Sequence, residues 1–449
     1  MKLSPKKYTS LVLAATVIIF LISVGLIYQH NGLMNGPPWF KWGWRSMPWT
    51  CNIFMLPGLI ICIAGYLVYE KKRNIKIALS CFLIANIYMQ IISVGTPPQS
   101  FSITNLNNRL IYKTINIHYN SQFNDAYIPD GPLDLLKNYE KYQTNEMKGH
   151  SVNKGPGMIL FYMFFISLFE EKSSAALISA LFILIISSLS IRALFTLAKV
   201  CSLGDKTAIT AAAIFSMSPA LTQLTPVFDT LYPILACTML SAWILAIKKN
   251  DWRYSLLFAS LLFISVMCTF ALLVLGFIFV TAGFFYVDKK KQFVKQSLIS
   301  AACFSTLFLL MKILFSFSIV QCFTTALKKE SEFQEMLNRP YPNTIPYDLV
   351  DFALGSSFVI AILVLIFLLV PRLRHKKTVL LCALFVGQIL VTTVTGLLRC
   401  ETVRVWLFMQ PFMMIPAALA MRKLPLHLKL IILVLIFCTS IAAFQNYWF

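Results

Sequence analysis

The stretch FNDAYIPDGPLDLLKNYEKYQTNEMKGHSVNKGPGMILFY, residues 123–162, brings carboxylates, lysines, tyrosines and a histidine together directly before an apolar run. Its order is an acidic loop, a short amphipathic helix, His150, and then the turn formed by Lys154, Gly155, Pro156 and Gly157. Glycine and proline mark a turn here, and the run MILFY after it is typical of a membrane-facing segment. The stretch therefore predicts a polar site folded back onto a membrane, with the rest of the chain as its scaffold.

The composition indicates a polytopic membrane protein. Of the 449 residues, 58% are hydrophobic and only 13% are charged, and the mean hydropathy is +0.73. Soluble domains have about 25% charged residues. Continuous apolar runs of about 20 residues, enough to cross a bilayer core as helix, recur along the chain, whereas a β-barrel would show alternating segments. The predicted fold class is therefore an all-α polytopic membrane protein.

About thirteen transmembrane helices are expected. The first follows Lys2, Lys6 and Lys7 and is interpreted as uncleaved, because no small-residue cleavage site follows it. Residues 254–287 contain 34 uncharged residues, which fit one overlong helix or two short ones. Two crossings are preferred because they keep the lysines that follow on the side of the other lysine clusters. The predicted spans are residues 9–28, 51–69, 76–94, 173–198, 207–219, 230–247, 254–269, 270–287, 297–317, 353–371, 378–396, 403–421 and 428–446.

The charges orient these spans. With the N-terminus in the cytoplasm, the loops on that side contain 23 of the 39 basic residues and four of the 18 acids, and the opposite loops contain 14 of each. This asymmetry follows the positive-inside rule, so the net charge of +21 requires no nucleic-acid partner. The expected location is the plasma (inner) membrane. The chain is expected to have three parts. These are an N-terminal three-helix segment (1–94), an extracytoplasmic loop with juxtamembrane helices (95–172) and C-terminal transmembrane helices with short outer loops (173–449).

Among the acids of the long loop, Asp125 is the candidate general base. It lies between Phe123 and Tyr127, and partial desolvation of a carboxylate raises its pKa toward the working pH. Tyr127 is expected to contact substrate beside it. The alternative is that the loop acids only keep the loop solvated, which is the preferred interpretation of Asp134 and Glu140.

Five further residues are candidates for substrate binding. His150 and Lys154 precede a glycine turn that enters a helix, an arrangement suited to a phosphate group, although a lysine also snorkels at interfaces. Asp229 places a charge beside apolar helices or caps a helix. Glu401 and Arg404 form a salt bridge or hold a sugar and a phosphate. Arg339 is a weaker candidate, and no cofactor or metal is predicted, because the cysteines lack metal-site spacing.

Several of these stretches resemble one family. His150, Lys154 and the apolar run to Tyr162 are similar to the loop-to-helix junction of the GT-C superfamily of polytopic glycosyltransferases, where His-Pro-Pro is usual. Three later stretches resemble the same family in the same order. They are SPALTQLTPVFDTLYPILA (218–236), LLFASLLFISVMCTFALLVL (256–275) and CETVRVWLFMQPFMMIPAA (400–418).

The resemblance, to the protein mannosyltransferase and aminoarabinose transferase type, implies a GT-C-like fold and an inverting extracytoplasmic glycosyltransferase. It implies a polyprenyl-phosphate sugar as donor and a saccharide, lipid or protein as acceptor, among membrane lipids. Asp125 matches the family's loop base, His150 and Lys154 its junction, and Glu401 and Arg404 its late charged motif.

Three other functions stay open at this point. A transporter or flippase of lipid-linked saccharides is one, an O-antigen-type ligase or polymerase another, and a non-catalytic membrane scaffold the third. Transporters place ionisable groups near the midplane of the membrane. Within the predicted spans only Arg192 and Lys312 are clearly intramembrane charges, which favours the transferase over the carrier.

Overall fold

The computed structural model describes residues 4–29, 53–96, 101–117, 120–287, 289–336, 339–370 and 376–444; Lys2 lies outside these ranges. Within them the regular structure is helical and contains no strand. The prediction of an all-α chain is confirmed for these residues.

Seven helical segments of the described chain are long and apolar enough to cross a membrane. They are α1 (Pro5–Gln29), α2 (Leu56–Lys72), α3 (Ile75–Gly95), the pair α9 (Lys172–Ser188) and α10 (Ser190–Val200), α13 (Tyr232–Lys249), α16 (Lys290–Phe315) and α20 (Lys376–Thr395). An eighth would be α18 (Ile345–Ser356) with α19 (Phe358–Leu369), which meet at 105°. The chain is thus an α-helical membrane protein.

Shorter helices occupy the other predicted spans. They are α11 (Asp205–Ser216), α14 (Trp252–Cys268), the 3₁₀ helix η4 (Ala271–Leu275) with α15 (Gly276–Tyr286), α22 (Gln410–Met421) and α23 (Leu426–Phe444). The uncharged residues 254–287 therefore form separate helices, as expected. Because several of these helices are short for a roughly 30 Å core, the number of crossings stays a prediction.

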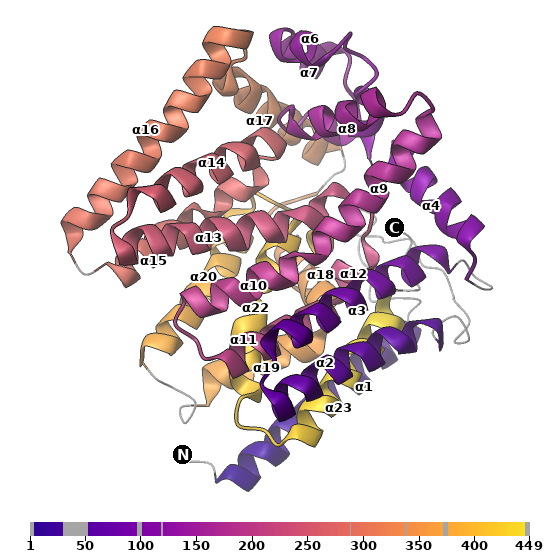
Figure 1. The fold of residues 1–449 in the computed structure, drawn as a ribbon, viewed down its shortest axis with the longest axis vertical. Coiled ribbons are helices and arrows are strands. Elements are labelled where there is room, and N and C mark those ends of the chain that lie inside the picture. The colour runs from indigo at the N-terminus through magenta and orange to yellow at the C-terminus, as the bar shows by residue number, and fades with distance from the viewer. Residues whose placement is uncertain are drawn as a thin grey trace.

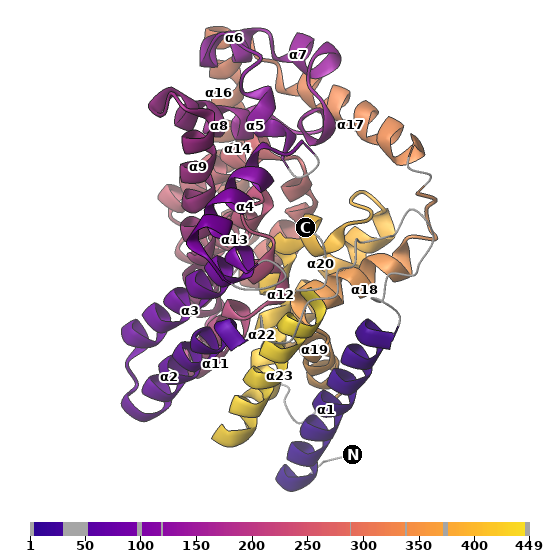
Figure 2. The same ribbon diagram turned by 90° about the vertical axis from the view of Figure 1, so that its right-hand side faces the viewer.

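The segment between α3 and α9 is folded as short helices. They are α4 (Ile103–Ile115), α5 (Ser121–Asp125), α6 (Pro132–Lys137), α7 (Tyr139–Asn145), the 3₁₀ helix η2 (Gly149–Ser151) and α8 (Gly157–Leu168). Figure 2 shows α6 and α7 with α17 (Ile319–Met336) at the end of the molecule opposite the N-terminus. In Figure 1, α1, α2, α3 and α23 lie side by side along one edge.

Basic residues of the predicted cytoplasmic loops gather together. Glu70 is within ion-pair distance of Lys429 (3.0 Å), Lys206 (3.6 Å) and Arg73 (3.9 Å), which come from three different loops. Lys248 donates hydrogen bonds to the Val200 carbonyl (2.6 Å) and the Ser202 hydroxyl. One carboxylate thus holds together the ends of α2, α11 and α23.

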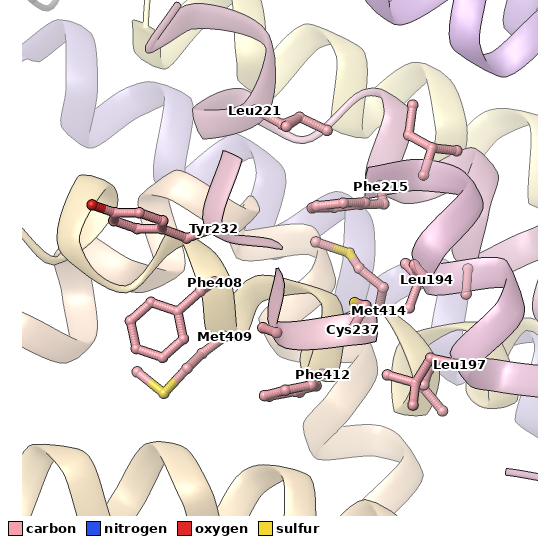
Figure 3. Close-up of a cluster of buried hydrophobic side chains, with 14 of the residues drawn as sticks. Leu194, Leu197, Phe215, Leu221, Tyr232, Cys237, Phe408, Met409, Phe412 and Met414 are labelled. Carbon is pink, nitrogen blue, oxygen red and sulfur yellow. The ribbon is translucent and has the colours of Figure 1, made fainter. Parts of the chain in front are cut away.

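The apolar core lies among α10, α11, α13 and α22, where leucine, phenylalanine and methionine side chains interdigitate (Figure 3). Phe215 of α11 and Phe412 of α22 are fully buried there, and Tyr232, at the start of α13, lies at the edge of this cluster. Lipid is as apolar as these side chains, so close packing stabilises the contacts between the helices. The core therefore fixes the starts of α13 and α22, which follow the segments that contain Asp229 and Arg404.

A buried polar network joins the N-terminal helices to the later ones. Gln90 of α3 donates to Asn86 (2.7 Å) and to Ser188 of α9 (2.9 Å), and accepts from Thr225. Asn86 donates to the Ser216 carbonyl at the end of α11 (2.8 Å). Helix α3 is thus joined to the later helices by buried hydrogen bonds, and the division into three parts stays a prediction.

Candidate functional site

A cavity of about 290 Å³ lies where α13, α17, α21 (Thr402–Val405), η2 and η4 meet. Its volume is near the lower end of small-molecule sites. Six of the eight predicted site residues line it, although they come from four separate parts of the sequence. They are His150, Lys154, Asp229, Arg339, Glu401 and Arg404.

Charged side chains at one end of the cavity alternate in sign. Asp229 is 3.3 Å from Lys154 Nζ and 3.6 Å from Arg404 Nε. Arg404 also contacts Glu401 at 2.6 Å, and Glu401 is 3.6 Å from Arg339. We call these five residues the charge chain. Buried charges are expensive unless they are paired, and here each acid has two basic partners.

Lys154 is positioned by a glycine turn against the end of α14. A Cβ on Gly155 would lie 2.4 Å from the Met267 carbonyl oxygen, and a Cβ on Gly157 would lie 2.9 Å from it. The Lys154 carbonyl accepts a hydrogen bond from the Tyr139 hydroxyl at 2.7 Å. The two glycines therefore allow the backbone contact that brings the lysine side chain into the cavity.

Asp229 lies in the 3₁₀ helix η3 (Phe228–Leu231), which precedes α13. It is buried, with 5% of its surface exposed, and it does not cap a helix: the N-cap of α13 is Leu231, which makes no side-chain capping bond. The capping alternative is therefore wrong for this carboxylate, whose partners are Lys154 and Arg404 instead.

Glu401 and Arg404 follow a strained turn. Cys400 and Glu401 both have left-handed backbone conformations, with φ of 63° and 51°, which non-glycine residues adopt at a cost. Asp348 accepts from the Cys400 N–H at 2.7 Å, and Asp351 accepts from the Val403 N–H at 2.8 Å. These two buried carboxylates hold the turn.

His150 is a neutral hydrogen-bond acceptor in the site. Its Nε2 lies 3.5 Å from an Arg404 guanidinium nitrogen, which has protons to donate. Burial and the neighbouring Arg404 lower the pKa of His150 to about 4. For Glu401, burial raises the pKa, but Arg404 and the other basic neighbours together outweigh burial and keep the pKa below the ordinary value. At neutral pH Glu401 is therefore ionised and His150 is uncharged.

Asp125 and Tyr127 do not line the cavity. Asp125 is 4% exposed, the Ser151 hydroxyl and the Lys148 backbone lie close enough to its carboxylate to lower its pKa, and its Oδ2 has no hydrogen-bond partner within the described residues. Burial raises the pKa of Asp125 to about 6. Tyr127 is 45% exposed and packs against Lys172, whose Nζ is 5.1 Å from the ring centre. Their predicted roles gain no support from this placement, because neither side chain is among those that line the cavity.

A second, polar cavity of about 10 Å³ links α5 to the charge chain. Asn120 and Gln122 line it on one side, and His150, Asp229 and Arg404 on the other. Such a volume is close to the space that one water molecule needs. Asp125 lies one helical turn beyond Gln122, so it is near the site without reaching the main cavity.

Among the polar residues of the main cavity that were not predicted are Asn153, Glu330 and Gln334. Glu330 and Gln334 follow Cys322 and Ala326 at intervals of four along α17, on the face that this helix buries. A signal was therefore present in the sequence, since polar residues continue an apolar stripe at helical spacing.

The other end of the cavity is apolar. Leu273 and Val274 of η4, Leu327 of α17 and Leu397 line it, and three of these side chains reach the surface, being 39% (Leu273), 50% (Leu327) and 60% (Leu397) exposed. Gln388 of α20 supports the junction of η4 and α15: it donates to the Val274 carbonyl (2.9 Å) and accepts from the Ile278 N–H (3.1 Å). The cavity thus has a charged end and an apolar opening.

No family model and no curated protein matches this chain. The GT-C resemblance therefore remains an expectation from the sequence. Within the described residues, no cluster of three or more His, Cys, Asp or Glu side chains is arranged to hold a metal ion.

Proposed function

We propose that the protein binds a polyprenyl-phosphate sugar in the main cavity and transfers the sugar to an acceptor hydroxyl. The observation that carries this proposal is the amphiphilic cavity. In its charged part, the two cations Lys154 and Arg404 both lie within ion-pair distance of the Asp229 carboxylate. Some of its apolar lining residues reach the surface. A lipid phosphate needs both environments, because its head loses hydration if it descends among apolar groups.

In this proposal the phosphate lies beside Lys154 and Arg404, with His150 accepting from the guanidinium. The Arg404 side chain is suited to a phosphate because its donors form a planar fork. The acceptor oxygen would bond to the anomeric carbon as the bond from that carbon to the phosphate oxygen breaks. The phosphate leaves with the electron pair, and a carboxylate takes the acceptor proton.

Purified protein should bind polyprenyl phosphate and should not bind the corresponding polyprenol, which lacks the phosphate. Lys154→Gln, which keeps a polar side chain one atom shorter and removes the charge, should weaken binding of the phosphate roughly 10-fold, because a charge-assisted contact contributes about 1.5–3 kcal/mol. Binding can be measured with fluorescent lipid probes in nanodiscs. Equal binding of the phosphate and the alcohol would reject the proposal.

We propose thirteen crossings with the charge chain on the extracytoplasmic side of the plasma membrane. Single cysteines placed at the exposed residues Glu140 and Glu332 should then react with an impermeant maleimide in intact cells, and cysteines at Lys72 and Lys249 only after permeabilisation. The wild-type protein gives the background of the native cysteines. Labelling of Lys72→Cys in intact cells would reverse the orientation.

A lipid-linked saccharide flippase is the second candidate, and the broken pair α18 and α19 favours it. The two helices meet at 105° around Ser357 (φ 86°), and discontinuous helices are typical of transporters. A flippase would move a fluorescent polyprenyl-phosphate sugar between leaflets of a vesicle without forming a new glycosidic bond. An O-antigen-type ligase or polymerase would form that bond, so product analysis groups it with the transferase.

A further inference from the structure

The cavity has a second polar cluster, separate from the charge chain, made by Asn153, Glu330 and Gln334. Gln334 of α17 donates its side-chain N–H to the Glu330 carboxylate at 2.6 Å, and Asn153 donates its side-chain N–H to the other oxygen of the same carboxylate. All three residues line the cavity. We call them the amide–carboxylate cluster.

The cluster presents acceptors that lack donors. A carboxylate only accepts, so both amides must turn their nitrogens toward Glu330 and their oxygens away from it. Asn153 Oδ1 and Gln334 Oε1 are buried, and neither has a hydrogen-bond partner in the part of the chain that the structure describes. Gln334 is 8% exposed. A buried acceptor without a donor is costly, so the cluster is suited to a ligand that brings O–H or N–H donors.

Glu330 also differs from the other acids of the cavity. Asp229 and Glu401 each contact two basic side chains, whereas Glu330 forms no ion pair within the described ranges; its neighbour Lys329 pairs with Glu332 instead. The two amide hydrogen bonds stabilise the Glu330 carboxylate in the absence of a neighbouring cation. Neutral hydroxyl groups can add further hydrogen bonds to this cluster, whereas a second anion next to the carboxylate would be repelled by it.

The cluster lies beside the proposed phosphate site. Asn153 directly precedes Lys154, and Phe333, between Glu330 and Gln334 on the lining of the cavity, contacts both His150 (6.5 Å between ring centres) and Arg339 (5.7 Å from the ring centre). A group bonded to a phosphate at Lys154 and Arg404 would therefore reach the cluster within the same cavity.

We infer that the amide–carboxylate cluster is the sugar subsite, which binds the hydroxyl groups of a neutral hexose attached to the lipid phosphate. This inference rests on the proposed function and adds the residues that select the sugar. Sites built to hydrogen-bond a hydroxyl group discriminate strongly against ligands that lack it, because their buried polar groups are then left unpaired.

The test compares the affinity for polyprenyl phosphate with that for the same lipid carrying glucose, galactose or mannose. At least one hexosyl lipid should bind wild-type protein roughly 10-fold more tightly than polyprenyl phosphate. Glu330→Ala and Gln334→Met should each abolish this gain; Gln334→Met should leave the affinity for polyprenyl phosphate unchanged, and Glu330→Ala, which removes an acid from the cavity, should not lower it. Gln334→Met preserves the volume of the buried side chain, so it tests the subsite even if Glu330→Ala does not fold.

Glu332→Ala is the matched control, since it removes an exposed acid from the same helix and should keep the gain. The inference is rejected if no hexosyl lipid binds wild type more tightly than polyprenyl phosphate does. It is also rejected if the two variants weaken binding of both lipids equally. Failure of wild type to bind either lipid would reject the proposed function as well, so the two failures are distinguishable.

Discussion

Arg404→Ala should reduce the affinity for polyprenyl phosphate by on the order of 100-fold or more. Arg404 is the central cation of the charge chain, because it contacts Asp229 and Glu401 and donates toward His150. Truncating one partner of a buried charge pair costs about 2–5 kcal/mol, much of it from the charge left without its partner. The variant also removes one of four basic residues that line the cavity against three acids, which leaves it without net positive charge.

Two controls separate binding from folding in this experiment. Arg404→Lys keeps the charge and loses the planar fork, so it should bind with intermediate affinity. Arg422→Ala removes an exposed arginine at the opposite end of the bundle and should bind as wild type does. The dissociation constant in nanodiscs is the readout, with the unfolding temperature measured alongside it. Wild-type affinity in Arg404→Ala would place the phosphate elsewhere.

Asp125→Asn should lower turnover by about 10²–10⁴ if Asp125 is the general base, which is the contribution of a positioned base. Burial raises the pKa of this carboxyl to about 6, and only the ionised form accepts a proton. Activity of the wild type should therefore rise with pH through about 6 and level off above it. Release of polyprenyl phosphate from the hexosyl lipid, followed as a function of pH, is the measurement.

The placement of Asp125 also defines the alternative result. Because α5, which ends at Asp125, packs against η2, which contains His150, a purely positioning role would lower phosphate affinity in Asp125→Asn along with turnover. If Asp125 is the base, Asp125→Asn should lose turnover and keep its affinity for the lipid. Glu140→Gln, on the exposed side of α7, is the control and should be near neutral. Full activity in Asp125→Asn, with loss in Asp229→Asn, would move the base to the charge chain.

The helical membrane architecture could be predicted because it depends on apolar length and on charge, both of which are local properties. The lengths of individual helices were less predictable. Ser357, with a φ of 86°, separates α18 from α19 inside the predicted span 353–371, and although Gly355 and Ser356 precede it, hydropathy alone marks no break there. The number of crossings therefore depends on packing that hydropathy does not report.

Site residues were predictable where a charge interrupts an apolar context. Asp229 satisfies that condition, His150 and Lys154 were marked by the glycine turn instead, and these three share the cavity with Arg339, Glu401 and Arg404. Asp125 and Tyr127 were chosen for their aromatic neighbours, but the direction of a side chain on a five-residue helix is set by tertiary contacts with η2. Glu330 and Gln334 were missed because α17 contains several other acids and lysines, among which two buried positions are not distinguished by residue type.

The contact of Gly155 and Gly157 with the end of α14 restricts which substitutions the chain can tolerate during evolution. A methyl group at either position would overlap the backbone of Met267, and backbone cannot give way as a flexible side chain can. Substitutions elsewhere in the apolar helices exchange one hydrophobic residue for another at small cost, so ancestral similarity erodes there first. Distant relatives are therefore better sought by two glycines that flank a proline, after a lysine, than by the overall resemblance of their spans.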